Sequence, residues 1–586
     1  MQPSQRISRR QFLSAVGAGG TAGVLSAVLS RQFETQPTLV RDTSASSNAT
    51  ASATEQRLGA SSTELNTTAA SDSGLTSLSR PNIVLILADD LGWSDLGCFG
   101  SEIATPNLDQ LAAEGTRFTG FTNNARCCPS RASLLTGLYP TQAGVGWMDE
   151  DAGSPPYQGR LNRSCVTLAE VLQSSGYRTG LFGKWHVGKF SNGVIPATRG
   201  FELSYGPHKA SYFRPVLFRN EKIIGTPRDR DFYLTDAITD EAVAGISDFG
   251  RSDAPFFTYV SYTAPHWPLQ ARKGDIAAYR GRYLGGWDAV REQRFARQRA
   301  LGLLPGVDAL PARDPTLPPW RDAKHREWHA DRMAVYAAQV SAVDRGVGRL
   351  LRTLDQLGIR ENTVVMFLSD NGASNEELHP RSGARTVSLN SRPMRSGNHT
   401  SITPGASDTF ASYGPAWAHA SNTPFKQFKR STYEGGIATP FIASWRGRGQ
   451  PGRIDHRLLH VMDVMPTIVE LAGATYPEKH HGVRIPPPEG PSFAALLSGK
   501  TATDWDDSRR LFWEHEGNRA VRHGQWKLVA PYGKPWELYD MEADRAEQYD
   551  LARRHRYLTE QLSDEWGRWA ERVGVRPWSP GRRYRV

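Results

Sequence analysis

The sequence predicts an α/β protein with a large, mostly parallel sheet sandwiched by helices, followed by a small C-terminal antiparallel sheet with a helix. Two observations predict the large sheet. Uncharged apolar runs, such as NIVLILA at 82–88 and TVVMFLS at 363–369, fit strands that are buried on both faces. Segments of helical periodicity lie between these runs, and strands that alternate with helices form sheets covered on both sides.

The strands expected in this sheet end in polar residues. They lie at 82–90, 177–186, 255–266 and 362–371. Helices are expected at 105–115, 166–176 and 334–358. Because ligands bind beyond the carboxyl ends of the strands in such sheets, we expect the polar residues to meet in one site.

The end of the chain has a different pattern. Residues 509–542 indicate short alternating strands joined by turns, and 554–574 indicate an amphipathic helix. We therefore predict a catalytic α/β domain at 80–504 and a C-terminal α+β subdomain at 505–586. Two irregular stretches remain, at 271–330 and 375–423, and the second is long enough to form a wall or lid of the site.

The first residues are typical of an export signal. SRRQFL at 8–13 carries paired arginines, and a Gly-rich, weakly apolar stretch without charge follows as far as Arg31. This pattern resembles a twin-arginine signal, so we expect a signal segment at 1–30, the twin-arginine export machinery as a partner, and a periplasmic or cell-envelope location. A retained membrane anchor is the alternative. Residues 31–79, rich in Ser, Thr and Ala, predict a disordered linker.

Composition limits the kinds of partner. The 586 residues include 70 Lys and Arg against 60 Asp and Glu, a net charge of +10, which favours anionic ligands. The charge is dispersed and no nucleic-acid-binding module is present, so no nucleic-acid partner is expected. Four cysteines are too few for a disulfide framework in a chain of this length.

Two acidic pairs indicate a metal site. Asp89 and Asp90 end one strand, and Asp370 and Asn371 end another. Three carboxylates and an amide oxygen suit Ca²⁺ or Mg²⁺, which take oxygen ligands. Each pair alone could equally be a solvated turn, but two pairs at corresponding strand ends favour a cation.

Basic residues accompany these pairs. Lys184 and His186 follow one strand, His266 follows another within APHWP, and Lys429 lies in KRSTYEGG. Positive charge beside a metal indicates an anionic substrate with several oxygens. His460 is interpreted as a structural histidine on a helical face.

The stretch CCPSRASLLTG at 127–137 places two cysteines before an expected helix. The pair could form a disulfide, bind a metal, act as a nucleophile or have no chemical role. A cysteine at a helix N-terminus, with Arg131 close by, would be an activated nucleophile. A plain thiolate, however, has no obvious role in a calcium and oxyanion site.

These eleven residues resemble the signature C-x-P-S-R-x-x-L-L-T-G of the sulfatase family, within the alkaline phosphatase superfamily. The resemblance extends from about Pro81 to the C-terminal helix, and residues 279–305 are similar to a stretch of bacterial arylsulfatases. It implies that a maturation enzyme oxidises Cys127 to formylglycine, an aldehyde. Cys128 then fills the variable position, as a small buried or solvent-facing residue.

The other motifs match the family in order, and the resemblance implies their roles. The metal ligands would be Asp89, Asp90, Asp370, Asn371 and the modified Cys127, holding one Ca²⁺. The catalytic residues would be Cys127, Arg131, Lys184, His186, His266 and Lys429. Lys184 and Lys429 would stabilise the sulfate oxygens, and Arg131 would help hold the attacking hydroxyl. His266 would protonate the leaving group, His186 would accept the proton lost at sulfate release, and Asp370 is the candidate base.

The expected function is hydrolysis of sulfate monoesters to sulfate and an alcohol or phenol. One alternative is a phosphatase or phosphonate monoester hydrolase on the same scaffold, although the sequence offers no convincing second set of Asp and His ligands. A carbohydrate sulfatase rather than an arylsulfatase is another, and a non-enzymatic surface protein that keeps the fold is a third. The sequence leaves open the substrate, the oligomeric state and the maturation enzyme.

The modification of Cys127 gives a first prediction. In protein from its own host, the tryptic peptide with Cys127 and Cys128 should have lost one sulfur and two hydrogens and gained one oxygen at Cys127. Mass spectrometry of that peptide measures the change. Two intact thiols in natively exported protein would contradict the predicted modification.

Overall fold

The computed structural model describes residues 80–209, 211–378, 385–389, 392–499 and 505–579. The predicted signal segment and linker, at 1–30 and 31–79, lie outside the described residues. Among the residues that are described, none of the helices has both the length and the apolar character needed to cross a membrane.

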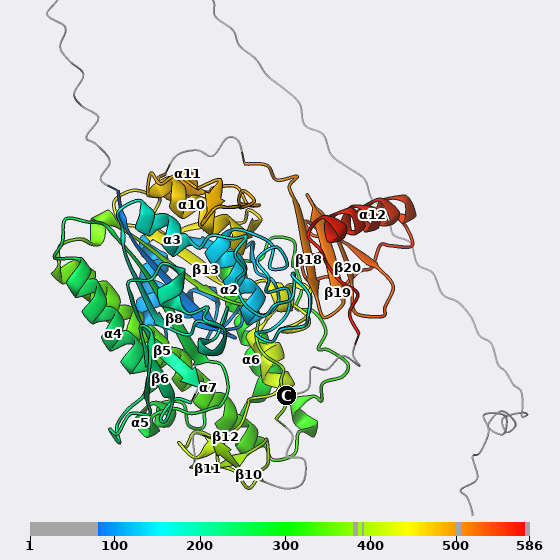
Figure 1. Ribbon diagram of the computed structural model, residues 1–586. Coiled ribbons are helices and arrows are strands. Elements are labelled where there is room, and N and C mark those ends of the chain that lie inside the picture. The colour runs from blue at the N-terminus through cyan, green and yellow to red at the C-terminus, as the bar shows by residue number, and fades with distance from the viewer. Residues whose placement is uncertain (1–79, 210, 379–384, 390–391, 500–504, 580–586) are drawn as a thin grey trace, which may run out of the picture. The chain divides into compact units, whose positions relative to one another are not determined.

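A large mixed sheet forms the centre of the α/β part (Figure 1). Its strands, from one edge to the other, are β14 (Arg453–Asp455), β2 (Thr116–Phe118), β13 (Phe441–Trp445), β9 (Thr363–Ser369), β1 (Asn82–Asp89), β8 (Phe256–Pro265), β4 (Arg178–Gly183), β5 (Leu203–Lys209), β6 (Val216–Arg219) and β7 (Lys222–Gly225). The run β9-β1-β8-β4-β5 is parallel, and antiparallel pairings occur at both flanks. The predicted mostly parallel sheet is confirmed.

Helices cover both faces of this sheet, and the alternation of side chains along β1 shows why. Val84 and Ile86 belong to one buried cluster, whereas Ile83 and Leu85 belong to the other. The first cluster includes α1 (Pro106–Glu114), α4 (Leu234–Phe249) and α7 (Arg326–Gln356). The second includes α2 (Cys127–Thr136), α3 (Leu168–Ser174) and α10 (Val464–Leu471). A strand with two buried faces must be apolar at every position, which explains the uninterrupted run in the sequence.

The stretch 271–330, predicted to be irregular, is partly helical. It contains α5 (Lys273–Ala277) and α6 (Gly286–Ala300), and α7 begins at Arg326 rather than at Ala334. The buried face of α6 carries Arg294, which is fully buried and pairs with Asp95 at 2.6 Å and with Glu102 at 2.8 Å. A charged residue on the buried face interrupts the apolar periodicity, so the sequence pattern did not indicate a helix.

The second long stretch, 375–423, contains a small sheet and a helix. These are β10 (Arg385–Leu389), β11 (Arg392–Ser396), β12 (Thr409–Phe410) and α8 (Pro415–Ser421). Glu376, which precedes this sheet in the sequence, and Phe410, in β12, line the cavity of the candidate site. The stretch therefore forms part of a wall, as predicted.

His460 is a correction to the sequence interpretation. It lies in a short strand, β15 (Leu459–His460), paired with β3 (Phe121–Thr122), and not on a helical face. It is fully buried, and its Nδ1 accepts a hydrogen bond from the Met462 amide at 3.2 Å. A strand of two residues is too short to leave a periodic signal, but the structural role expected for this histidine agrees with its contacts.

The C-terminal part is an antiparallel sheet with one helix, as predicted. Its elements are β18 (Arg510–His515), β19 (Asn518–His523), β20 (Trp526–Ala530), β21 (Glu537–Asp540) and α12 (Arg556–Arg572). Lys527, on β20, is fully buried, and its Nζ lies 2.8 Å from both Glu434 Oε1 and Glu547 Oε1. Because Glu434 opens α9 (Glu434–Ile437), this contact ties the C-terminal sheet to the segment that follows Lys429.

Lys527→Met should destabilise the protein by about 3–5 kcal/mol, since it removes the cation that lies 2.8 Å from both Glu547 and Glu434 and leaves Glu434 only Arg545, at 3.7 Å. The free energy of unfolding from urea titration measures the change. Lys534→Met, the same substitution at an exposed position of the same sheet region, is the control and should stay within about 0.5 kcal/mol of the wild type. Equal stabilities of the two variants would contradict the role given to Lys527.

Candidate active site

The two acidic pairs meet at the carboxyl ends of β1 and β9. These strands are parallel neighbours, with Ala88 opposite Ser369, so the residues after them share one edge of the sheet. The Asp90 amide donates to Asp370 Oδ1 at 3.2 Å, and the Asn371 Nδ2 amide donates to Asp90 Oδ1 at 2.8 Å. Asp89, Asp90, Asp370 and Asn371 are all buried.

Three cations surround these carboxylates. Arg131, from α2, donates to Asp370 Oδ2 through Nε at 3.0 Å and Nη2 at 2.7 Å. Lys184 Nζ lies 2.5 Å from Asp89 Oδ2, and Lys429 Nζ lies 2.8 Å from Asp90 Oδ2. In the sequence, these three cations and the acidic residues lie in separate segments. In the folded protein they lie together.

The burial of so many charges affects their pKa values. Burial and the neighbouring Asp89 charge raise the pKa of Asp370 to about 7. In Asp89 the effect of burial is outweighed by Lys184, His266 and Arg131, so its pKa is well below the usual range. The two carboxylates thus differ in their surroundings, because the nearby cations lower the pKa of Asp89 while burial and Asp89 itself raise that of Asp370.

The donor set fits a hard cation. Asp89 Oδ1 and Asn371 Oδ1 are buried and have no hydrogen-bond partner. Unpaired buried oxygens are costly, and carboxylate and amide oxygens are the ligands that Ca²⁺ takes. Asp89, Asp90, Asp370 and Asn371 could therefore hold such an ion.

Cys127 is the first residue of α2 and points into this cluster. Its Sγ lies within 4.8 Å of carboxylate oxygens of Asp89 and Asp370, and the residue is 1% exposed. Burial raises the pKa of its thiol, although Lys429 and Lys184 act in the opposite direction. An unmodified Cys127 is therefore a neutral thiol rather than an activated nucleophile.

Cys128 points away from the cluster. Its side chain belongs to the buried core on the α2 side of the sheet and is fully covered. Cys127 and Cys128, like the other two cysteines, are free thiols, so the adjacent pair forms no disulfide.

The two predicted histidines lie near Lys184, whose charge acts on both rings. His266 Nε2 is 3.5 Å from Asp90 Oδ2, and its Nδ1 is 2.6 Å from the Trp267 carbonyl oxygen. Because a carbonyl only accepts, Nδ1 of His266 carries a hydrogen and Nε2 faces the cluster. His186 follows β4 with a left-handed φ of 62°, and burial, with the charges of Lys184 and Arg131, lowers its pKa well below the usual value. His186 is thus a neutral imidazole.

Glu376 is a site residue that the sequence analysis missed. Its carboxylate accepts a hydrogen bond from Trp267 Nε1 at 2.7 Å and lies 3.8 Å from Lys429 Nζ and 3.5 Å from Arg126 Nη1. It therefore links the wall beside His266 to one of the three cations. Its position in the loop after Asp370 was the available signal, but two adjacent glutamates follow there and the sequence does not distinguish them.

A cavity of about 750 Å³ opens above the cluster. Cys127, Lys184, His186, His266 and Lys429 lie at its base. Its upper wall is largely apolar and aromatic, formed by Phe190, Ile195, Phe218, Trp267 and Phe410. The site thus combines an anion-binding base with a hydrophobic entrance.

Comparison with known proteins gives the family. A sulfatase family model matches residues 81–474, and a model of the C-terminal region of N-sulphoglucosamine sulphohydrolase matches 425–568. An uncharacterized sulfatase of Schizosaccharomyces pombe is 35% identical over 85% of this chain and 94% of its own length. An arylsulfatase of Klebsiella aerogenes is 34% identical over 67% and 87%. A solved structure, Ps i-CgsB in complex with k-i-k-neocarrahexaose, has 26% identity and a TM-score of 0.60, over 84% of this chain and 93% of that one.

Proposed function

We propose that this chain, which belongs to the sulfatase family and is a sulfuric ester hydrolase, cleaves aryl sulfate monoesters with a formylglycine made from Cys127 and one calcium ion. One observation carries the proposal. Cys127 Sγ lies within 4.8 Å of the carboxylate oxygens of Asp89 and Asp370, at the base of a cavity lined by cations. A side chain modified at this position would lie against both the metal ligands and the bound sulfate.

The two added groups have distinct contributions. Asp89, Asp90, Asp370 and Asn371 would hold the calcium ion, which supplies positive charge at the sulfate oxygens. When formed, the aldehyde hydrate supplies two hydroxyls on one carbon, one for attack on sulfur and one for release of sulfate. The neutral thiol of the unmodified Cys127 supports the need for this modification.

The chain's own cations bind and orient the substrate. A sulfate ester has three equatorial oxygens that carry negative charge, and Lys184 and Lys429 reach the base of the cavity with their ammonium groups. Arg131, with 0% of its side chain exposed, is held by Asp370 and Ser261 and keeps Asp370 oriented. Charges fixed before the substrate arrives stabilise the transition state without reorganisation.

Two histidines move protons. His266 Nδ1–H is fixed by the Trp267 carbonyl and Nε2 faces the cluster 3.5 Å from Asp90, so in its imidazolium form His266 would pass the proton on Nε2 to the leaving oxygen. His186 is neutral, which suits acceptance of the proton lost when sulfate leaves.

The cavity wall supports an uncharged aromatic leaving group. The other charged side chains that line the cavity, outside the sulfate-binding cluster, form ion pairs. Arg126 pairs with Glu376 at 3.5 Å, and Lys189 pairs with Asp149 at 3.1 Å. A phenol would pack against Phe218, Trp267 and the other apolar side chains. A carbohydrate leaving group is the alternative, because the similar structure of Ps i-CgsB was solved in complex with k-i-k-neocarrahexaose.

Maturation and export remain parts of the proposal. A formylglycine-generating enzyme would act on Cys127, and the twin-arginine machinery would carry the protein to the periplasm or cell envelope. The signature at 127–137 supports the first partner, and the paired arginines at 9–10 support the second.

The adjacent cysteines provide a matched pair of variants. Cys127→Ala should reduce hydrolysis of p-nitrophenyl sulfate to background, because it removes the precursor of the nucleophile. Cys128→Ala should stay near the wild-type rate, since Cys128 contacts the core. Initial rates of both purified variants test this, and equal losses would contradict the assignment of Cys127.

The role of His266 predicts a dependence on the leaving group. His266→Ala should cost about tenfold with p-nitrophenyl sulfate, whose phenolate needs little protonation, and about a thousandfold with an alkyl sulfate. His208→Ala, which removes another histidine of the same cavity wall, is the control and should affect both substrates equally. The ratio of kcat/KM values measures the effect, and an equal loss on both substrates for His266→Ala would refute the general-acid role.

A further inference from the structure

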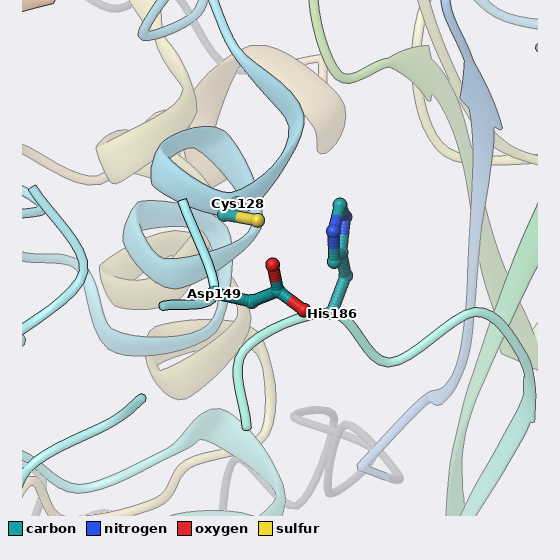
Figure 2. A group of neighbouring side chains, drawn as sticks. All are labelled: Cys128, Asp149 and His186. Atoms are coloured by element: carbon teal, nitrogen blue, oxygen red, sulfur yellow. The ribbon is translucent and has the colours of Figure 1, made fainter. Parts of the chain in front are cut away.

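A second group of metal-ligating side chains lies beside the candidate active site. It consists of Cys128 on α2, Asp149 in the loop that follows, and His186 after β4 (Figure 2). One sulfur, one carboxylate oxygen and one ring nitrogen of these residues all lie within 4.8 Å of one another. The three residues are far apart in the sequence, which explains why the sequence analysis found no second set of ligands.

The state of His186 and the position of Asp149 suit ligands. His186 Nδ1 is buried and has no hydrogen-bond partner. Its imidazole is neutral, so one of the two ring nitrogens offers a lone pair. Figure 2 shows the Asp149 carboxylate lying between the Cys128 sulfur and the His186 ring.

The chemistry of this group differs from that of the oxygen cluster. Sulfur and nitrogen ligands favour Zn²⁺ and other soft divalent ions, whereas Ca²⁺ takes oxygen ligands. A thiolate, a carboxylate and a neutral imidazole leave one position of a tetrahedral shell for water. On binding, the Cys128 thiol would lose its proton to solvent and form the sulfur–metal bond, so the charge of the ion is balanced by Cys128 and Asp149.

An ion can reach this group, and the ligands can close around it. Asp149 and His186 both line the active-site cavity. Bond lengths of about 2.0–2.3 Å bring tetrahedral ligands to roughly 3.5 Å from one another, so a movement of about 1 Å is needed. Asp149 is half-buried on a loop, and its partner Lys189 Nζ, at 3.1 Å, has a side chain that is 38% exposed and free to turn into solvent.

We propose that Cys128, Asp149 and His186 bind a soft divalent cation such as Zn²⁺, separately from the calcium site, and that this binding inhibits hydrolysis. Inhibition follows because the ion takes the imidazole of His186, and this second half of the proposal rests on the role given to His186 above. The metal-binding half rests only on the geometry of the three side chains.

Binding is tested on mature enzyme, shown by peptide mass to carry formylglycine and kept in excess Ca²⁺. Cys127 then contributes no thiol, and calcium protects the oxygen cluster. Titration with Cd²⁺ should give one equivalent of the ultraviolet thiolate-to-cadmium charge-transfer band. Cys128→Ala should abolish the band, and Asp149→Asn should weaken Cd²⁺ binding at least about tenfold. Cys165→Ala is the matched control, because Cys165 is a buried thiol beside Arg199 instead.

Inhibition is tested on the same proteins with Zn²⁺ and p-nitrophenyl sulfate. The Zn²⁺ concentration for half-inhibition should rise at least about tenfold in Cys128→Ala and in Asp149→Asn, and stay unchanged in Cys165→Ala. Without Zn²⁺, the rate of Cys128→Ala should match the wild type.

The outcomes separate the two halves of the proposal from the proposed function. A cadmium band that persists in Cys128→Ala, or that is lost equally in Cys165→Ala, overturns the site. A Cys128-dependent band without inhibition by Zn²⁺ overturns the inhibitory role. The band needs no turnover, so a Cys128-dependent band in a protein that fails to hydrolyse sulfate esters supports the site while the proposed function fails.

Discussion

The packing of three carboxylates at the ends of two neighbouring parallel strands is the constraint on which the rest of this structure depends. Asp89, Asp90 and Asp370 are buried within one hydrogen-bonded cluster. Buried carboxylates this close together are stable only when cations lie close by. The three basic residues of the site, each from a different segment of the chain, meet that requirement and at the same time create the environment in which an oxyanion is stabilised.

The same constraint explains why the active-site loops carry so many polar contacts. Trp267 lies between the His266 ring and the Glu376 carboxylate, and Glu376 also lies near Lys429. Trp267 and Glu376 therefore contact both the proton donor, His266, and a cation, Lys429. The orientation of His266 depends on packing around Trp267 as much as on charge, which couples the apolar wall of the cavity to the chemistry at its base.

The sequence predicted the large sheet and the small C-terminal antiparallel sheet because each carries a local signal. The strands β1 and β9 are apolar throughout, and the polar residues directly follow them. Other features depend on contacts between distant segments. Helix α6 carries the buried Arg294, whose partners Asp95 and Glu102 lie almost two hundred residues earlier. Glu376 and Asp149 gain their roles only from neighbours brought near by folding, and no local pattern indicates them.

The buried contact between Lys527 and Glu434 has a consequence for how the protein is made. Chain synthesis delivers the carboxylates of β1 early, the segment with Lys429 and Glu434 much later, and Lys527 some 93 residues after Glu434. All side chains of the catalytic cluster are therefore synthesised before β20, the strand whose Lys527 contacts Glu434 in the segment after Lys429. A chain that ended between the large sheet and β20 would contain all residues of the cluster but would lack the Lys527 contact with Glu434.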